Sequence, residues 1–144
     1  MLNEQEKNSF VNSISEVLRS LNTRSQDIIS RRFGLKTGGI ETLESIGKKY
    51  KITRERVRQI EEASLRELRK NFDGFNLKEQ VSKVKDIVQD YGNVVRQDFL
   101  FYEFSGSHQY NKVNAALVFL MTVSSTFDFH PEDDDYFSLW TVKD

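Results

Sequence analysis

Apolar residues recur at helical spacing in the first part of the chain. Over the segment 6–21 they fall at i, i+4, i+7, i+8 and i+11, which is one stripe of an amphipathic helix: Phe10, Ile14, Val17, Leu18 and Leu21. A second helix is predicted to begin at a capping box, in which Thr23 is the N-cap and Gln26 reaches back, and to end at Gly34. Its inward residues are Ile28, Ile29 and Phe33.

A short helix, a tight turn and a longer helix are predicted over residues 42–70. Thr42 is well placed to cap the short helix. Gly47 in its middle costs ~1 kcal/mol relative to alanine, so we expect the next helix to approach so closely there that a side chain would block it. Thr53 caps the long helix, which runs over about residues 54–70. The inward residues of the short helix are Leu43, Ile46 and Tyr50.

The long helix carries different chemistry on its two sides. At 100° per residue its apolar side collects Val57, Ile60, Ser64 and Leu68, and the opposite side of its first two turns collects Arg54, Glu55, Arg58 and Gln59. In a helix-turn-helix only those turns reach base edges in the DNA major groove. Arginine pairs with guanine, glutamine with adenine, and glutamate accepts from the cytosine amino group. Basic residues available for phosphates are Lys48, Lys49, Lys51, Arg56, Arg66 and Arg69.

Arginine and glutamate alternating on a helix also have a simpler interpretation, as a solvated face with ion pairs between neighbouring turns. Three features favour the helix-turn-helix instead. The preceding helix is capped, a glycine lies where the two helices would touch, and the residue types that read bases are confined to the N-terminal turns.

The motifs in residues 12–70 resemble region 4, the −35-recognition domain of housekeeping-type bacterial sigma factors. They appear in the family's order and spacing, at residues 31–35 (RRFGL), 42–47 (TLESIG), 53–61 (TRERVRQIE) and 65–69. The resemblance implies that the four base-reading residues contact the −35 element. It departs from the family at Ala63 and Glu67, where basic residues are usual, and nothing in the chain resembles region 2.

The same resemblance implies two further contacts. Thr42 is expected to join the phosphate contacts, and the upstream helices are expected to cradle the β flap of RNA polymerase core. The residues predicted for this docking are Ile28, Ile29, Arg32 and Phe33. Because region 2 melts the promoter in that family, we expect either that another factor melts the DNA while this chain contacts its upstream part, or that the chain is a regulator placed at a −35-like site.

A different pattern follows residue 76. A helical stripe over 77–88, a short extended piece at 93–95, two helices over 97–104 and 110–123, and a hairpin over 126–142 are predicted. This order predicts a winged helix; an unrelated α+β cap is the alternative. The predicted fold is therefore mainly α, a sigma region 4-like helix-turn-helix followed by a winged-helix-like module with a C-terminal β-hairpin.

The charge divides in the same place as the pattern. Residues 1–70 carry 15 Lys and Arg against 10 Asp and Glu, a net +5, and residues 71–144 carry 6 against 12, a net −6. Turn residues occupy 71–75, so we predict a DNA-binding domain over 1–70, a linker over 71–75 and an interaction domain over 76–144.

The second module is not expected to bind DNA. Its third helix carries one lysine, Lys112, and the turn of its hairpin carries four carboxylates that a phosphate backbone would repel: Glu132, Asp133, Asp134 and Asp135. The run lacks the spaced ligands and the glycine of a calcium loop. We predict that residues 76–144 bind a protein partner or a second copy.

Composition excludes several classes of protein. The chain has no cysteine, and its two histidines, His108 and His130, have no ligand-like neighbours, so no metal or other cofactor is expected. No phosphate loop or nucleophile–base arrangement is present, so an enzyme is not expected. No membrane span or secretory signal is evident, which predicts a cytoplasmic, nucleoid-associated protein. The prediction is a transcription initiation protein that binds duplex promoter DNA; the alternative is an adaptor that holds polymerase without reading DNA.

Overall fold

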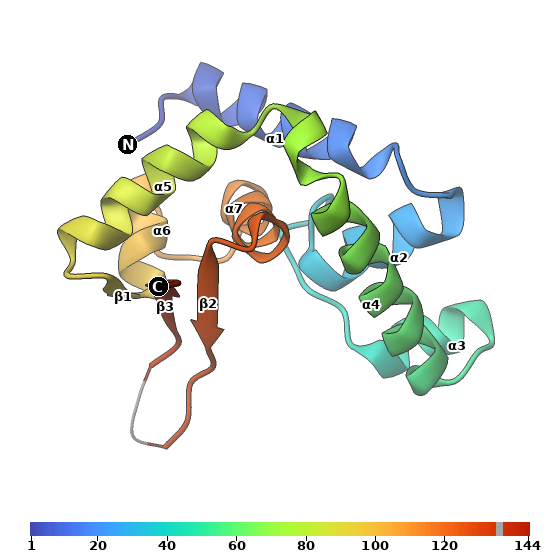
Figure 1. Ribbon diagram of the computed structural model, residues 1–144. Helices are drawn as coiled ribbons and strands as arrows, with labels where there is room; N and C mark the ends of the chain where they lie inside the picture. The colour runs from blue at the N-terminus through green and yellow to red at the C-terminus, as the bar shows by residue number, and fades with distance from the viewer. Residues whose placement is uncertain (135–136) are drawn as a thin grey trace.

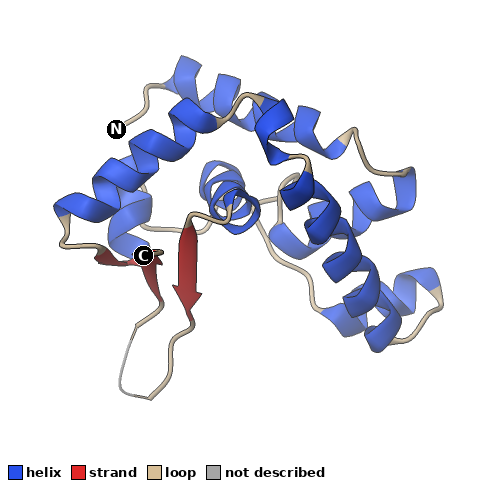
Figure 2. Ribbon diagram, viewed as in Figure 1, coloured by secondary structure: helices blue, strands red, loops and turns tan. Residues whose placement is uncertain are grey.

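The computed structural model describes residues 1–134 and 137–144 and is mainly helical with one small sheet (Figures 1 and 2). This confirms the predicted fold class. The elements in chain order are α1 (Glu4–Leu18), α2 (Thr23–Phe33), α3 (Leu43–Tyr50), α4 (Arg54–Lys70), the 3-10 helix η1 (Phe72–Phe75), α5 (Lys78–Asp90), β1 (Val94–Arg96), α6 (Gln97–Ser105), α7 (Lys112–Ser124), β2 (Phe127–His130) and β3 (Leu139–Val142). Within the described residues, no helix is long and apolar enough to cross a membrane.

Local sequence signals set the helix-turn-helix formed by α3 and α4. The side chains of Thr42 and Thr53 accept hydrogen bonds from the third backbone N–H of their helices, at 3.1 and 3.0 Å, as predicted. A Cβ added to Gly47 would lie 2.7 Å from the carbonyl oxygen of Ile52 in the turn. A close approach at this glycine was predicted correctly, but the turn makes it and not the next helix, whose first residue, Arg54, has its backbone nitrogen 3.5 Å from that Cβ.

The predicted N-cap of α2 was wrong by one residue. Asn22 holds the cap position in extended backbone, and its side chain accepts from the backbone N–H of Ser25 at 2.9 Å. Thr23 is the first helical residue, and the Gln26 side chain donates to the Leu21 carbonyl instead of closing a capping box. Asparagine caps at least as well as threonine, so the helix can begin one residue earlier.

The second half has the predicted winged-helix order, α5-β1-α6-α7-β2-β3. Its three strands are antiparallel in the order β1-β3-β2, with Trp140 of β3 paired to Val95 on one side and Phe129 on the other. The predicted acidic turn lies between β2 and β3. Asp135 of that turn and Tyr136, predicted within the hairpin, lie outside the described residues.

Helix α7 occupies the centre of the molecule and is buried on nearly every side. In Figure 1 it is seen end-on, with α1 above it, α2 and α4 to the right, and α5 and α6 to the left. The main hydrophobic core contains residues of all these helices and of β1, β2 and β3. The buried side chains of α7 are Asn114, Ala115, Ala116, Leu117, Phe119, Leu120, Met121 and Val123.

Polar and aromatic contacts also join the two halves of the chain. The Tyr110 hydroxyl donates to the Phe33 carbonyl at the end of α2, at 2.6 Å, and the Phe33 ring packs edge-on against Phe119 of α7 with centroids 5.3 Å apart. The guanidinium of Arg69, in the last turn of α4, donates to the Thr122 carbonyl of α7 at 3.1 Å. The halves predicted at 1–70 and 76–144 thus share one core, and their division at 71–75 stays a prediction.

A smaller core supports the helix-turn-helix. It consists of Ile28 of α2, Ile46 of α3, and Val57 and Ile60 of α4, with Leu43, Tyr50 and Ile52 packed around it. Because α3 and the start of α4 extend beyond the main core, this cluster fixes how they are presented.

We expect Gly47→Ala to lower the free energy of unfolding by about 1–2 kcal/mol, although alanine favours helix by ~1 kcal/mol, because the methyl group would press on the Ile52 carbonyl and open the turn. Chemical denaturation measures the effect. The control is Gly74→Ala, where a Cβ meets nothing within 4 Å. Equal stability of the two variants would contradict the close approach.

Candidate nucleic-acid interface

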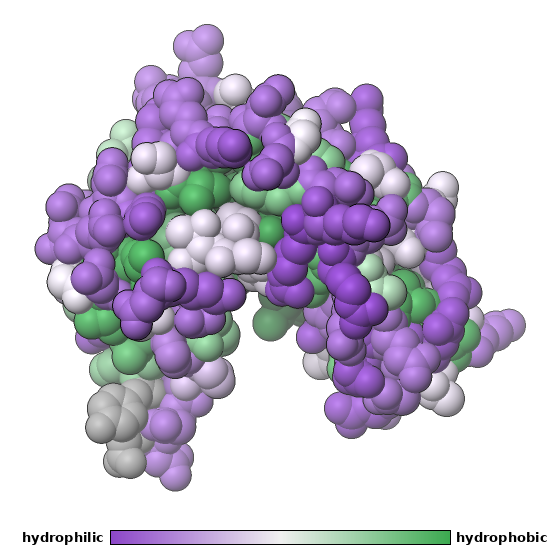
Figure 3. Space-filling model, in the orientation of Figure 1, coloured by the Kyte–Doolittle hydropathy of each residue, from purple (hydrophilic) through white to green (hydrophobic). Residues whose placement is uncertain are grey.

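The four predicted base-reading residues lie together on the exposed side of the first two turns of α4. Arg54, Glu55, Arg58 and Gln59 are all exposed, while Val57 and Ile60 on the other side are buried in the smaller core. Figure 3 shows hydrophilic side chains gathered over the part of the molecule that contains α3 and α4. The arrangement gives a polar surface on a rigid apolar support.

Ion pairs hold this surface in a defined arrangement. The guanidinium of Arg58 donates to both carboxylate oxygens of Glu55, at distances down to 2.7 Å, and to Glu62 at 2.7 Å. Hydrogen bonds from Arg58 lower the pKa of Glu55, and the same bonds raise the pKa of Arg58. The simpler interpretation, a solvated face with ion pairs, therefore describes this helix in the absence of a ligand.

The seven predicted phosphate residues are all exposed, and they fall into two groups. One group lies on α3, on the turn and at the start of α4: Thr42 at the N-cap of α3, Lys48 and Lys49 in its last turn, Lys51 in the turn, and Arg56. The other consists of Arg66 and Arg69, which lie 12 and 15 residues beyond Arg54 in α4, a rise of about 18–22 Å. Arg66 pairs with Glu62 at 3.3 Å, and Arg69 anchors α4 on α7.

The residues predicted to dock on polymerase lie mostly inside the protein. Ile28 and Ile29 are 0% exposed and Phe33 is 9% exposed, so these side chains lie in the two cores and offer little or no surface to a partner. Arg32 donates to the Glu61 carboxylate at 3.2 Å and to the Glu41 carbonyl at 2.9 Å. The helical spacing of Ile28, Ile29 and Phe33 in the sequence therefore reflects their burial in the core.

A polar network that the sequence prediction missed fixes α2 against α3. Arg31 donates to Asp27 at 2.9 Å and to Glu41 at 3.0 Å, and the Tyr50 hydroxyl donates to the same Asp27 carboxylate. Burial alone would raise the pKa of Asp27, but the hydrogen bonds from Tyr50 and Arg31 outweigh it and lower the pKa. The i, i+4 spacing of Asp27 and Arg31 was the available sequence signal.

In the part of the winged-helix half that the structure describes, no comparable surface is present. In the DNA-binding use of this fold the third helix enters the groove, but that position is taken here by α7, which is buried against α1, α2 and α4. Glu132, Asp133 and Asp134 of the hairpin turn are exposed. Within the described residues, no group of three or more His, Cys, Asp or Glu side chains could hold a metal ion.

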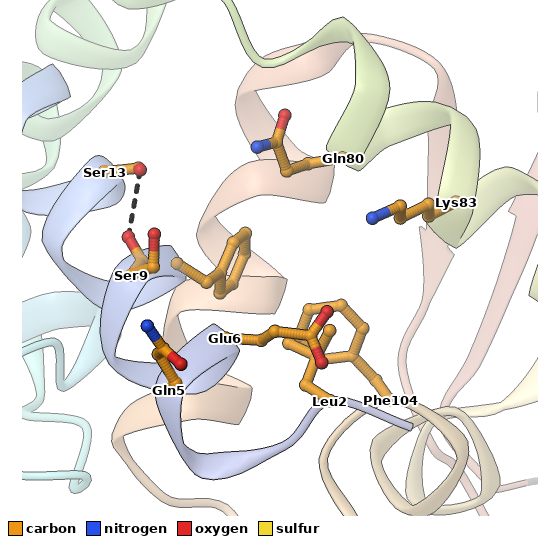
Figure 4. Close-up of a pocket in the computed structure, with 9 residues that line it drawn as sticks. Leu2, Gln5, Glu6, Ser9, Ser13, Gln80, Lys83 and Phe104 are labelled. Carbon is orange, nitrogen blue, oxygen red and sulfur yellow. Dashed lines mark hydrogen bonds between the residues drawn. The ribbon is translucent and has the colours of Figure 1, made fainter.

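A groove of about 330 Å³ lies between α1 and α5 and contains no residue of α3 or α4 (Figure 4). Leu2, Phe10 and Phe104 form its apolar part, and the side chains of Glu6 and Lys83 point into it from the two helices. It is separate from the polar surface of α4.

The comparisons with known proteins concern the first half of the chain. The sequence model of the family described as Sigma-70, region 4, matches residues 17–70. The RNA polymerase sigma factor SigA of Nostoc sp. is 46% identical over 63 residues, which are 44% of this chain and 16% of that protein. SigA of Lactococcus lactis subsp. cremoris is 45% identical over 56 residues, 39% of this chain and 15% of the relative.

A third relative, SigA of Clostridium acetobutylicum, is 46% identical over 54 residues, 38% of this chain and 14% of that protein. The resemblance to sigma region 4 is thereby confirmed for residues 17–70. The chain spans less than a fifth of the length of each of these curated relatives.

We expect Asp27→Asn to lower the free energy of unfolding by about 1–2 kcal/mol near pH 7, because it removes a partly exposed charged acceptor shared by two donors. A carboxyl whose pKa is lower in the folded protein than in the unfolded chain stabilises the fold above its ordinary pKa, here 3.8, and loses this contribution as the pH falls through the folded value. The difference between the two proteins should therefore shrink below about pH 4.

Denaturant unfolding at several pH values measures this difference. Asp73→Asn, at an exposed position in η1, controls for removal of a carboxylate without removal of the network. A destabilisation that stays constant down to pH 2–3, or about equals that of the control, would contradict the assigned role of Asp27.

Proposed function

With residues 17–70 matched to sigma-70 region 4, we propose that this protein binds duplex promoter DNA at a −35-like element and acts in transcription initiation. The observation that carries the proposal is the exposed side of the first two turns of α4, where Arg54, Glu55, Arg58 and Gln59 stand together on a buried support. These residue types offer bidentate contacts to guanine and adenine and an acceptor for cytosine.

The charges around the turn support the same proposal. Lys48 and Lys49 end α3, Lys51 lies in the turn and Arg56 in the first turn of α4, and all four are exposed. Such residues would bind the phosphates that flank a major groove entered by α4. We leave Arg69 outside this set, because its Nε–H donates to the Thr122 carbonyl and joins α4 to α7.

The ion pairs of Arg58 suit a residue that discriminates between bases. In the free protein its guanidinium already has carboxylate acceptors, from Glu55 and Glu62. A base with a single acceptor atom would be a poor substitute for these carboxylates. Guanine offers two acceptor atoms, O6 and N7, and would be a better substitute. Arg58 would therefore leave its intramolecular partners only at a matching base pair.

We also propose that the protein contacts RNA polymerase core, in keeping with its sigma-like half, through exposed residues of α1 and α2. Buried Ile28, Ile29 and Phe33 would then shape the docking surface from within. Residues 76–144 would contact a protein, because their third helix is occupied by the core and their hairpin turn is acidic. In all of these proposed roles the protein binds partners without catalysing a reaction. Its proposed location is the bacterial chromosome.

One observation favours a second candidate function, an adaptor that holds polymerase without reading DNA. The same ion pairs that support base discrimination would also suit a face that only meets solvent. Binding to duplex DNA separates the two functions, because an adaptor of this kind would not bind a −35 duplex more tightly than random DNA.

The test compares Arg58→Ala with Lys49→Ala on a −35-containing duplex and on a random duplex, at two salt concentrations. Arg58→Ala should weaken binding to the specific duplex by about 5- to 150-fold and leave random DNA nearly unchanged, because it removes a base contact. Lys49→Ala should weaken both duplexes alike and reduce the salt dependence by about one ion.

Fluorescence anisotropy on the full chain measures these affinities. Equal losses on both duplexes for Arg58→Ala would overturn the base-reading assignment. No binding of the unaltered chain to either duplex at low salt, together with retained binding to polymerase core, would favour the adaptor.

A further inference from the structure

Three exposed aromatic side chains form a strip on the acidic half of the molecule. Phe99, Tyr102 and Phe137 are 38%, 44% and 58% exposed. Helix α6 fills the core with Leu100, Phe101 and Phe104, so Phe99 and Tyr102, one turn apart on its outer side, are apolar without serving the core. Exposed apolar clusters of this kind mark contact surfaces.

Charged and aromatic neighbours hold the strip rigid. The guanidinium of Arg96 lies 4.2 Å from the ring centre of Phe99 and 3.7 Å from that of Phe137, between the two, and pairs with both carboxylate oxygens of Asp98 at 3.1 and 2.9 Å. At the other end the His108 ring stacks on Tyr102 with centroids 4.6 Å apart. Rigid aromatic side chains lose little entropy on binding, which makes them effective anchors.

The surroundings of the strip determine the charge of its partner. The half of the chain that carries the strip, residues 71–144, has 12 Asp and Glu against 6 Lys and Arg, and Arg96, the cation within the strip, is already paired with Asp98. A partner must therefore bring positive charge together with an apolar group. The basic half of the same chain, with its net charge of +5, brings the charge.

The basic half also carries the apolar group. Ile40, 65% exposed, lies in the loop between α2 and α3, close in sequence to exposed Lys36. The loop is held in shape by backbone hydrogen bonds from Gly38 to Gly34 at 2.8 Å and from Glu41 to Arg31 at 2.9 Å. It therefore presents Ile40 outward in a fixed position.

From this complementarity we propose that the aromatic strip of one molecule receives the Ile40 loop of a second copy of the chain. The contact joins two different surfaces, so each molecule has one strip and one loop to offer, and association is head-to-tail. The inference deepens the proposed protein-contacting role of residues 76–144 and does not depend on DNA binding.

Sedimentation velocity of the full chain without DNA tests the contact. The unaltered chain should associate with rising concentration, and more weakly at about 500 mM than at about 50 mM salt, because the charges of the two halves are screened. Phe99→Ser combined with Phe137→Ser, and separately Ile40→Ser, should each raise the dissociation constant at least about tenfold. Phe129→Ser is the matched control, because Phe129 is 45% exposed but pairs with Trp140 on the sheet face opposite Arg96.

Mixing the two defective variants gives the sharpest result. The Ile40→Ser chain keeps its strip and the strip variant keeps its Ile40, so an equal mixture should form dimers that grow no further, although each variant alone is a monomer. Undiminished association of Ile40→Ser alone would mean that strips bind each other and would overturn the proposal. A monomeric unaltered chain at all concentrations at low salt would also overturn it.

The variants must stay folded and retain the proposed function for these results to count. Ile40 is exposed in a loop, so its variant tests the contact even if the double phenylalanine variant is destabilised, which circular dichroism would reveal. Both variants should bind the −35 duplex as the unaltered chain does. Loss of association with retained DNA binding supports the contact alone, while absence of DNA binding in every variant would count against the proposed function alone.

Discussion

The burial of α7 is the constraint on which the other features of this structure depend. The helix is apolar around almost its whole circumference, so it needs neighbours on every side. Helices α5 and α6 and strand β2 cover one part of it, and α1, α2 and α4 of the sigma-like half cover the rest. Neither half covers this helix alone. The two halves therefore pack together because α7 has apolar side chains on all sides.

This burial also divides the functional roles between the halves. A winged helix that reads DNA exposes its third helix, but here exposing α7 would open the main core. The sigma-like half keeps a free helix because α4 is anchored to α7 only near its C-terminal end, where Arg69 bonds to the Thr122 carbonyl. Its first two turns lie on the smaller core around Val57 and remain exposed. One helix supports the core, and the other is free to meet a ligand.

Features that depend on neighbouring residues could be predicted from the sequence. The caps at Thr42 and Thr53 and the tight contact at Gly47 are determined within a few residues, and all three were found. The cap of α2 was missed by one residue because Asn22 and Thr23 are nearly equal candidates. The order of helices and strands in the winged helix was also predictable, because the spacing of apolar residues within each element indicates whether it is a helix or a strand.

Features that depend on distant partners were not predictable in the same way. Apolar spacing shows that Ile28, Ile29 and Phe33 face inward, but it does not tell a core from a docking surface. The change of charge near residue 71 suggested two separate modules, yet charge describes the surface and the shared core is apolar. The strongest missed signal was α7 itself, because an apolar helix with no polar face requires more partners than its own half supplies.

On the exposed side of α4, neighbouring carboxylates offset part of the charge of the arginines. Arg58 is flanked by Glu55 and Glu62, and Arg66 shares Glu62, so part of the positive charge is neutralised within the helix. A phosphate must compete with these carboxylates for the guanidinium of Arg58, which weakens a contact that depends on charge alone. Under the proposed function, the exposed lysines around the turn would supply general attraction to DNA. The paired arginine would then respond only to a base edge that satisfies both of its donors, so affinity and discrimination would reside in different residues of the same motif.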